Sequence, residues 1–454
     1  MKDEWPGTRG SEERIRRRRL CSFLISFPSS FILHPTGGAF VTEAIYWETF
    51  SNGLVLAAEP MPWLESAAFT LLVPAGCVDE PEGRGGLSGL ACEMTLRGAG
   101  PRDSRRFILD LDNLGVERSE AVTDAHASYS GATLAAHLPE ALAIYADVVR
   151  SPHLPDDQLE AARLAMLQDL RAVEDEPSEK VMIELRRRHY PKPWGRPPQG
   201  ERKALEEITI GEVRRHVAAH FRPNDAILGV AGNFSWDALK DAVGRLFGDW
   251  QPGEVRAVVE APSGREKAHL PYESNQTHIG IAYPSVPYRH PDYFQAWGAV
   301  GVLSGGMSAR LFTEVRERRG LCYSVYASYH TVRDHGGVFC YAGTSADRAQ
   351  ETLDVTLREL IRLARGVEEH ELNRLKARIK SALIMQQESS SARSGAVARD
   401  WYHLGRVRTL DELGRLVDAL TCRSINGYLA EHPPGDFAVV TLGPRELEVR
   451  LGVS

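Results

Sequence analysis

Apolar positions along this chain change their spacing in a regular order, and the order is the same in both halves. Short runs rich in β-branched and aromatic residues, which are typical of strands, alternate with stretches whose apolar residues recur every three or four positions, as in amphipathic helices. Each half has three strand-like runs, at 67–74, 128–136 and 226–230 and at 279–283, 337–343 and 437–441. This order predicts an α+β fold in which helices pack on a mostly antiparallel sheet in each half.

The chain also repeats itself at a nearly constant offset. Residues 218–232 align with residues 429–443, an offset of 211. A helical stripe recurs at an offset of 213, in which Leu159, Ala162, Met166 and Leu170 are matched by Leu372, Leu375, Ile379 and Leu383. Two offsets this similar indicate a duplicated domain with small insertions. We therefore predict homologous domains at 41–251 and 271–454, joined by a linker at 252–270 that is rich in Pro, Gly and charge.

Residues 1–40 do not follow this pattern. Arg16–Arg19 precede the apolar run Leu20–Phe27, and small residues end the segment at Gly37–Ala39, an order that resembles a secretory signal. Polar residues and proline interrupt the apolar part, and a start codon assigned too far upstream explains the same residues. We favour this second interpretation and expect a cytoplasmic protein; a periplasmic, exported protein is the alternative if residues 1–39 act as a signal. No later apolar run approaches the roughly 18 residues that a membrane-spanning helix needs.

The composition excludes several classes of function. The chain has 454 residues and 43% hydrophobic residues, which is enough apolar material for more than one domain. Its formal net charge of -7, with basic residues interspersed among acidic ones, provides no basic surface for nucleic acid. The six cysteines include no C-x-x-C pair, so we expect free thiols rather than a disulfide framework or a zinc ribbon.

A helix predicted at residues 87–94 separates its residues onto two faces. One face is an apolar stripe of Leu87, Leu90, Ala91 and Met94. The opposite face carries Gly89, Cys92 and Glu93, and could line a site, although Gly89 offers no ligand atom. Cys92 is a candidate nucleophile, but the neighbouring carboxylate of Glu93 would raise the pKa of its thiol. We therefore favour an inert, buried thiol.

The segments around this helix resemble those of the insulinase/pitrilysin family, the inverted zincins. Asp79–Gly83 leads into the helix and Met94–Gly98 closes it, as in that family. Further landmarks follow in the family's order at Tyr190–Pro197, Arg222–Phe234 and Gly305–Phe312, so the likeness covers roughly residues 45 to 445. It implies two-domain units that face each other and enclose an unfolded peptide, which adds a strand to a sheet edge.

The resemblance also implies where a zinc site would lie. Active members read H-x-x-E-H on this helix, where two histidines and a distant glutamate hold zinc and the glutamate of the motif is the general base. Here Gly89 and Glu93 stand at the histidine positions, Cys92 at the base position, and Asp169 on or near the third-ligand position. This set cannot form a zinc site of ordinary geometry and leaves no base. We expect no metal or other cofactor on this chain, and no peptidase activity from it alone.

His216 and His220 are a second pair of metal candidates. Their i, i+4 spacing on a predicted helix would allow both rings to reach one ion. No third ligand can be identified in the sequence. We therefore favour a solvated or partly packed pair of histidines.

The second half keeps a feature of the family's substrate site. The run Leu311–Tyr326 is similar to the family segment whose arginine and tyrosine, seven residues apart, reach across the chamber to the scissile peptide. The matching residues are Arg316 and Tyr323, which would bind a substrate carbonyl or carboxylate and hydrogen-bond the developing oxyanion. The alternative is that Arg316 is one of several exposed charges on a helix and Tyr323 is a core aromatic residue on the next strand.

The resemblance leads to a functional hypothesis with two alternatives. We interpret the chain as the zinc-free subunit of a heterodimeric insulinase-type peptidase, in which a partner chain carries H-x-x-E-H and zinc. This chain would close the chamber and present Arg316 and Tyr323 to an extended peptide held on the partner. The alternatives are a structural scaffold, like the family's core subunits of respiratory complexes, and a module that binds peptides without cleaving them.

Overall fold

The computed structural model describes residues 44–264 and 267–450. The predictions for residues 1–40, a signal or a misassigned start, therefore lie outside the described residues. In the part of the chain that the structure describes, no helix is both long and apolar enough to cross a membrane.

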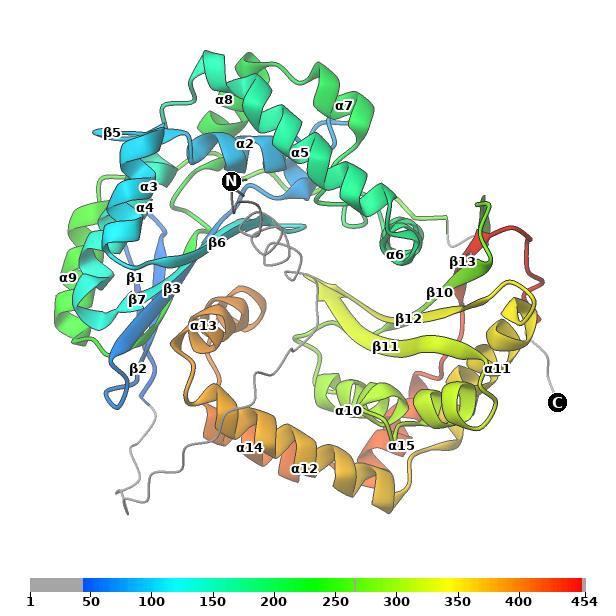
Figure 1. Cartoon of the computed structure of the whole chain (residues 1–454). Helices are drawn as coiled ribbons and strands as arrows, with labels where there is room; N and C mark the ends of the chain where they lie inside the picture. Colours follow the sequence, from blue (N-terminus) through cyan, green and yellow to red (C-terminus); the bar gives the residue numbers. More distant parts are fainter. Residues whose placement is uncertain (1–43, 265–266, 451–454) are drawn as a thin grey trace, which may run out of the picture. The chain divides into compact units, whose positions relative to one another are not determined.

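The first half of the chain forms a six-stranded sheet (Figure 1). In spatial order its strands are β1 (Tyr46–Thr49), β2 (Val55–Pro60), β8 (Ile227–Gly232), β3 (Ser66–Val73), β7 (Ala127–Leu134) and β6 (Glu117–Val122). Only the β2–β8 pair is parallel among these strands. The helices of this half are α2 (Leu87–Thr95), α3 (Ser104–Asn113), α4 (Leu138–Arg150), α5 (Leu159–Glu174), α6 (Pro177–His189), α7 (Arg202–Glu207), α8 (Ile210–His220) and α9 (Trp236–Phe247).

The second half forms a five-stranded sheet with a similar plan. Its strands, in spatial order, are β11 (Cys322–Val332), β12 (His335–Ser345), β10 (Gln276–Ser285), β13 (Ala438–Gly443) and β9 (Ala268–Pro271). Only β13 and β9 are parallel among them. Its helices are α10 (Tyr293–Ser304), α11 (Ala349–Arg362), α12 (Glu369–Gln386), α13 (Ser390–Leu404), α14 (Leu410–Asp418) and α15 (Cys422–Glu431).

The α+β prediction is confirmed, and each predicted strand-like run overlaps a strand of these sheets. The predicted linker at 252–270 needs a correction. Strand β9 begins at Ala268 and pairs with β13, so the second sheet starts inside the predicted linker. The composition of the segment hid this short strand, because charged residues lie on both sides of it and the strand itself ends in Pro271.

Helices of each half cover one face of its own sheet. Phe69 of β3 packs edge-on against Tyr145 of α4, with ring centroids 5.0 Å apart. Leu90 of α2 lies in the same buried cluster. In the second half, Ile281 of β10 shares a buried cluster with Leu303 of α10. These two cores fix the positions of α2 and of the helices around β11.

Helix α6 belongs to the first half in sequence but packs on the second sheet. Its Val181 and Leu185 are fully buried in one cluster with Phe339 of β12 and Val440 of β13. Gly280 of β10 permits this close approach, because a Cβ atom at that position would lie 2.7 Å from a methyl carbon of Val181.

Helix α13 makes the reciprocal contact with β2, β3 and β8 of the first sheet (Figure 1). A Cβ atom on Gly229 of β8 would lie 2.6 Å from the carbonyl oxygen of Ser394. The hydroxyl groups of Ser390 and Ser394 are hydrogen-bonded to those of Ser66 and Thr70 on β3. Helices α6 and α13 begin at residues 177 and 390. These starts are 213 residues apart, which equals the second offset found in the sequence repeat. Equivalent helices are therefore exchanged between the two sheets, which sequence analysis did not predict.

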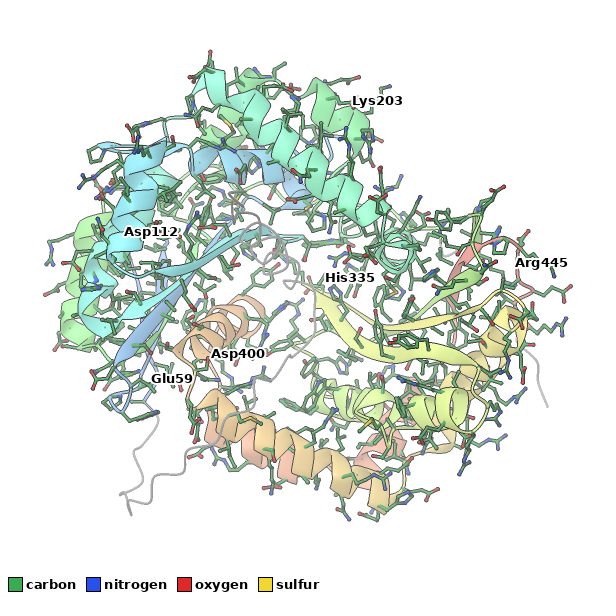
Figure 2. The ribbon with its side chains drawn as sticks, in the orientation of Figure 1. Glu59, Asp112, Lys203, His335, Asp400 and Arg445 are labelled. Atoms are coloured by element: carbon green, nitrogen blue, oxygen red, sulfur yellow. The ribbon has the colours of Figure 1, made fainter. Side chains whose placement is uncertain are left out.

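A buried ion pair ties the exchanged helix α13 to β2. Nη2 and Nε of Arg393 lie 2.5 and 2.8 Å from Oε2 of Glu59, and the two side chains are 1% and 3% exposed. The same guanidinium donates to the carbonyl oxygen of Arg408, whose own guanidinium pairs with Asp400 of α13. Figure 2 labels Glu59 and Asp400 at the two ends of this arrangement.

Candidate functional site

The N-terminus of α2 is built around a buried carboxylate. Oε1 of Glu80 accepts hydrogen bonds from the backbone N–H groups of Gly86 and Ser88, at 3.0 and 2.9 Å. Such bonds satisfy donors that have no partner within the helix. Burial raises the pKa of Glu80 from 4.5 to about 7, although both N–H groups lower it. Glu80 thus anchors the helix that would carry the family's zinc ligands, and sequence analysis did not identify it.

The predicted faces of α2 are present, but neither is open. The apolar stripe is buried, and so is Cys92 on the other face, at 5% exposure. The hydroxyl of Thr95 donates to the carbonyl oxygen of Cys92 and is hydrogen-bonded to the hydroxyl of Tyr129 at 2.9 Å. Burial raises the pKa of the Cys92 thiol to about 12, and the charges of Glu120 and Glu93 add smaller increases. The thiol therefore stays protonated at neutral pH, chiefly because of burial rather than because of Glu93.

The space beside Gly89 is filled by a side chain from α5. A Cβ atom at residue 89 would lie 2.6 Å from Cε of Met166 and 3.7 Å from its Sδ. The carbonyl oxygen of Pro198 is 3.6 Å from the same point. Gly89, which we expect at the position of the first family histidine, is therefore packed against the thioether of Met166.

The remaining positions of the degenerate site are not assembled around one point. Glu93 pairs with Arg97 one turn later on α2, with 2.7 Å between Oε1 and Nη2. Asp169 is exposed on α5. Of the residues of α5, Met166 contacts the position of Gly89. Asp169 lies three residues further along the same helix.

These donors do not fit the zinc ion that the family implies. The set contains no imidazole, its thiol is held protonated by burial, and Glu93 is already paired with a guanidinium. In residues 44–264 and 267–450, no three potential ligands converge beside α2.

His216 and His220 are packed together on α8, with ring centroids 4.6 Å apart. Nε2 of His216 lies 3.3 Å from the hydroxyl oxygen of Ser88 on α2, and Nδ1 of His220 lies 3.7 Å from Oδ1 of Asp79. Burial lowers the pKa of His216 to about 3, so its ring is neutral. The interpretation of a packed pair is confirmed, and the pair supports α2 from behind its N-terminal turn.

Arg316 and Tyr323 lie together at the start of the edge strand β11. Arg316 belongs to a π-helical turn at Phe312–Glu317. Its Cζ lies 4.9 Å from the ring centroid of Phe312 and 5.6 Å from that of Tyr323. The cation is thereby held over two aromatic rings while remaining exposed.

A β-bulge turns Tyr323 outward. The register between β11 and β12 shifts between Cys322 and Ser324, so Tyr323 has no partner on β12. Its side chain is 85% exposed. The alternative interpretation of Tyr323 as a core aromatic residue is therefore wrong: it lies on an edge strand, and its neighbour Cys322 is buried whereas Tyr323 itself is exposed.

Comparison with known proteins agrees with this fold. The sequence model of the family described as "Insulinase (Peptidase family M16)" matches residues 55–197, and the model described as "Peptidase M16 inactive domain" matches residues 207–379. An uncharacterized zinc protease of Bacillus subtilis is 25% identical over 399 residues, covering 87% of this chain and 97% of that protein. A similar protein of Mycobacterium tuberculosis is 26% identical over 410 residues, covering 87% and 92%.

Solved structures show the same fold at lower identity. The peptidase M16 inactive domain from Pseudomonas fluorescens has a TM-score of 0.82 at 20% identity, covering 89% of this chain and 99% of that one. A chain of complex III2 from Candida albicans has a TM-score of 0.74 at 20% identity, covering 88% and 96%. The fold and the degenerate helix define a two-domain protein of the zinc-peptidase type. The chain belongs to the insulinase family of peptidases.

Proposed function

We propose that this chain is the zinc-free, catalytically incompetent subunit of a heteromeric insulinase-family peptidase. A partner chain with H-x-x-E-H would hold zinc and carry out hydrolysis. This chain would close the peptide chamber and contribute Arg316 and Tyr323 to the substrate bound on the partner. The observation that carries the proposal is the contrast between a filled zinc-site position at Gly89 and an exposed Arg316–Tyr323 pair.

The filled position supports the first half of the proposal. A hydrolytic zinc site needs ligands and an open coordination position for water. Met166 occupies the space beside Gly89, and Cys92 cannot replace a general base because burial keeps its thiol protonated. Activity would therefore have to come from another chain.

The exposed pair supports the second half. An exposed tyrosine with a free hydroxyl and an adjacent guanidinium are donors suited to a carbonyl oxygen that gains negative charge. Phe312 holds the guanidinium in place without using its N–H groups, because a cation–π contact leaves the edge of the group free.

The sheets offer edges for an extended peptide. Strand β6 is an edge of the first sheet and packs beside α2, and β11, which carries Tyr323, is an edge of the second. Unpaired N–H and C=O groups at an edge can bind a peptide as an added strand. These two strand edges are compatible both with a peptidase subunit and with the alternative of a peptide-binding module.

The test is hydrolysis of a quenched fluorescent peptide by this chain alone, by the H-x-x-E-H homologue of the same genome alone, and by the mixture, with zinc content measured for each protein. We expect activity that requires both chains, with zinc on the partner. No gain on mixing with a zinc-loaded partner would overturn the proposal in favour of the scaffold or the peptide-binding module. Zinc-dependent activity of this chain alone would contradict it directly.

A further inference from the structure

A group of metal-ligating side chains lies in the second half of the chain, where α10 begins and α15 ends. One oxygen of Asp292, one oxygen of Glu431 and one ring nitrogen of His432 all lie within 4.8 Å of one another. Asp292 precedes α10, Glu431 is the last residue of α15, and His432 follows it. We propose that these three side chains bind a divalent transition-metal ion of the zinc type, which joins the ends of the two helices.

The two helices hold the ligands at this spacing. Gly298 in the middle of α10 allows close packing, because a Cβ atom there would lie 3.3 Å from Cδ1 of Ile425 on α15. Both helices lie in the buried core of the second half. The backbone N–H of His432 also bonds to the carbonyl oxygen of Tyr428, which fixes the end of α15. A tetrahedral ion with bonds of about 2.1 Å needs ligand atoms about 3.4 Å apart, which small side-chain rotations can provide.

Asp292 is the N-cap residue of α10, but its side chain does not cap the helix. Aspartate before a helix usually accepts a hydrogen bond from the first turn. Here the carboxylate caps no backbone N–H of α10, and the backbone N–H of Asp292 itself donates to Nδ1 of His290. The carboxylate is placed near a second carboxylate instead, and a cation bound between them would relieve their mutual repulsion.

The end of α15 has the same unbalanced charge. Helix C-termini carry partial negative charge and favour basic residues. The last turn of α15 contains no basic residue and ends at Glu431. In the described part of the chain, neither Glu431 nor Asp292 forms an ion pair with a lysine or arginine; the basic groups near Asp292 are His290, at 3.8 Å, and His432 within the group itself. A divalent ion bound by all three side chains would supply positive charge at this point.

His432 adds an imidazole nitrogen to the two carboxylates of this group. Its ring packs against Tyr428 and, edge-on, against His290, with centroids 5.1 and 6.0 Å apart. One imidazole nitrogen with two carboxylate oxygens is a donor set that zinc, cobalt and nickel accept, with water in the remaining positions. Exposure of Glu431 and His432 leaves the ion accessible and exchangeable. This inference departs from the expectation of a metal-free chain, and it does not depend on the proposed function.

The experiment is a titration of the full, metal-stripped chain with Zn²⁺, followed by calorimetry, with Co²⁺ absorption as a second probe of the ligand set. We expect one strong site and a higher thermal midpoint when zinc is bound. Asp292→Asn and His432→Gln should each weaken binding about ten-fold or more and abolish the midpoint shift. The matched control is His370→Gln, because His370 also lies beside a carboxylate, Glu368, at 3.2 Å on the surface.

Two outcomes would overturn the proposal. One is the absence of zinc binding, or binding that both ligand variants leave unchanged. The other is binding that His220→Gln removes while His432→Gln does not, because this result would place the ion at the paired histidines of α8. A variant that fails to fold would be replaced by Glu431→Gln, which lies on the surface at the end of its helix.

Discussion

Cε of Met166 lies 2.6 Å from the point that a Cβ atom on residue 89 would occupy. A glycine on one helix and a methionine on another are therefore packed against each other at the position where the family's first zinc ligand is expected. Any side chain larger than hydrogen at residue 89 must displace the end of Met166. This displacement makes the pair testable by its effect on stability.

Gly89→Ala should give little or no gain in stability, although alanine in the middle of a helix normally gains about 1 kcal/mol over glycine. The reason is the close approach of Met166, whose flexible end must move to make room for the new Cβ atom and so offsets part of the gain. In a Met166→Ala background the clash is absent, and Gly89→Ala should be stabilising. Urea unfolding of the four chains gives the coupling energy, which we expect to exceed about 0.5 kcal/mol. Additive effects would contradict the packing of the two residues.

Restoring the motif should not restore zinc. The triple variant Gly89→His, Cys92→Glu, Glu93→His supplies H-x-x-E-H, but Met166 still occupies the space of the first ring and Asp169 is shorter than the family's glutamate. We expect substoichiometric zinc in this variant after dialysis against a chelator, measured by elemental analysis. Because the group at Asp292 could retain an ion, the comparison is made in a His432→Gln background. One equivalent of zinc and robust cleavage by the triple variant would refute this prediction.

Arg316→Ala and Tyr323→Phe should lower turnover by the reconstituted pair of chains about 10²-fold or more, the scale for loss of a transition-state donor. Both residues are exposed, so neither change should alter the folded state. Steady-state cleavage of a fluorescent peptide measures the effect, and circular dichroism checks the fold. Tyr272→Phe, an exposed tyrosine beside β9, is the control and should leave turnover unchanged. Unchanged kinetics in both test variants would remove this role from the proposal.

Glu80 should make stability depend on pH. Because burial raises its folded-state pKa above 4.5 to about 7, the folded chain binds more protons than the unfolded chain in this range. Titration of Glu80 should therefore contribute a slope that lowers the free energy of unfolding by up to about 3 kcal/mol as the pH rises from 4.5 to 7. Glu80→Gln keeps an oxygen that can accept the N–H bonds of Gly86 and Ser88, and should flatten this slope.

Urea unfolding between pH 4.5 and 8 measures the slope. The Glu80→Gln variant keeps the contributions of other buried groups: Asp79, whose pKa burial raises to about 6, acts in the same direction as Glu80, and His216, whose pKa burial lowers to about 3, acts in the opposite direction. The effect of Glu80 is therefore the difference between the two curves. Glu82→Gln, an exposed neighbour, should behave as the parent chain. Parallel curves for the parent and for Glu80→Gln would show that the carboxyl of Glu80 titrates alike in both states.

The ion pair between Glu59 and Arg393 should be costly to break. Removing one member takes the salt-bridge partner away from a buried charge, which costs about 3–5 kcal/mol. We expect Arg393→Met alone to destabilise strongly, and Glu59→Gln with Arg393→Met to be closer to the parent chain. Arg256→Met breaks an exposed pair with Glu254 and should have no measurable effect in the same unfolding assay. Equal effects of Arg393→Met and Arg256→Met would contradict the buried pair.

The strands and the duplicated plan were predictable, because apolar spacing reports directly which face of an element is buried. The positions of Gly89 and Cys92 on α2 followed from the same spacing. The cause of the high pKa of Cys92 did not, because sequence shows the adjacent Glu93 but not the burial that contributes more.

Other features depend on contacts between distant segments. Met166 was visible in the sequence as part of a helical stripe, but nothing local shows that its tip reaches Gly89. The sequence predicted a substrate contact for Tyr323 from the family segment, with a core residue as the alternative, but it could not show the bulge beside β12 that accompanies its exposure. The anchor role of Glu80 had one weak signal, an acidic residue six positions before a glycine that opens a helix.

The exchange of α6 and α13 bears on how such a chain could arise. A single ancestral copy would present a bare sheet face and a helix with nowhere to bury its apolar side. Two copies would satisfy each other by trading that helix, which is the arrangement of a domain-swapped dimer. In one chain, each half therefore supplies the helix that covers the other half's sheet, and the folding of either half depends on the presence of the other.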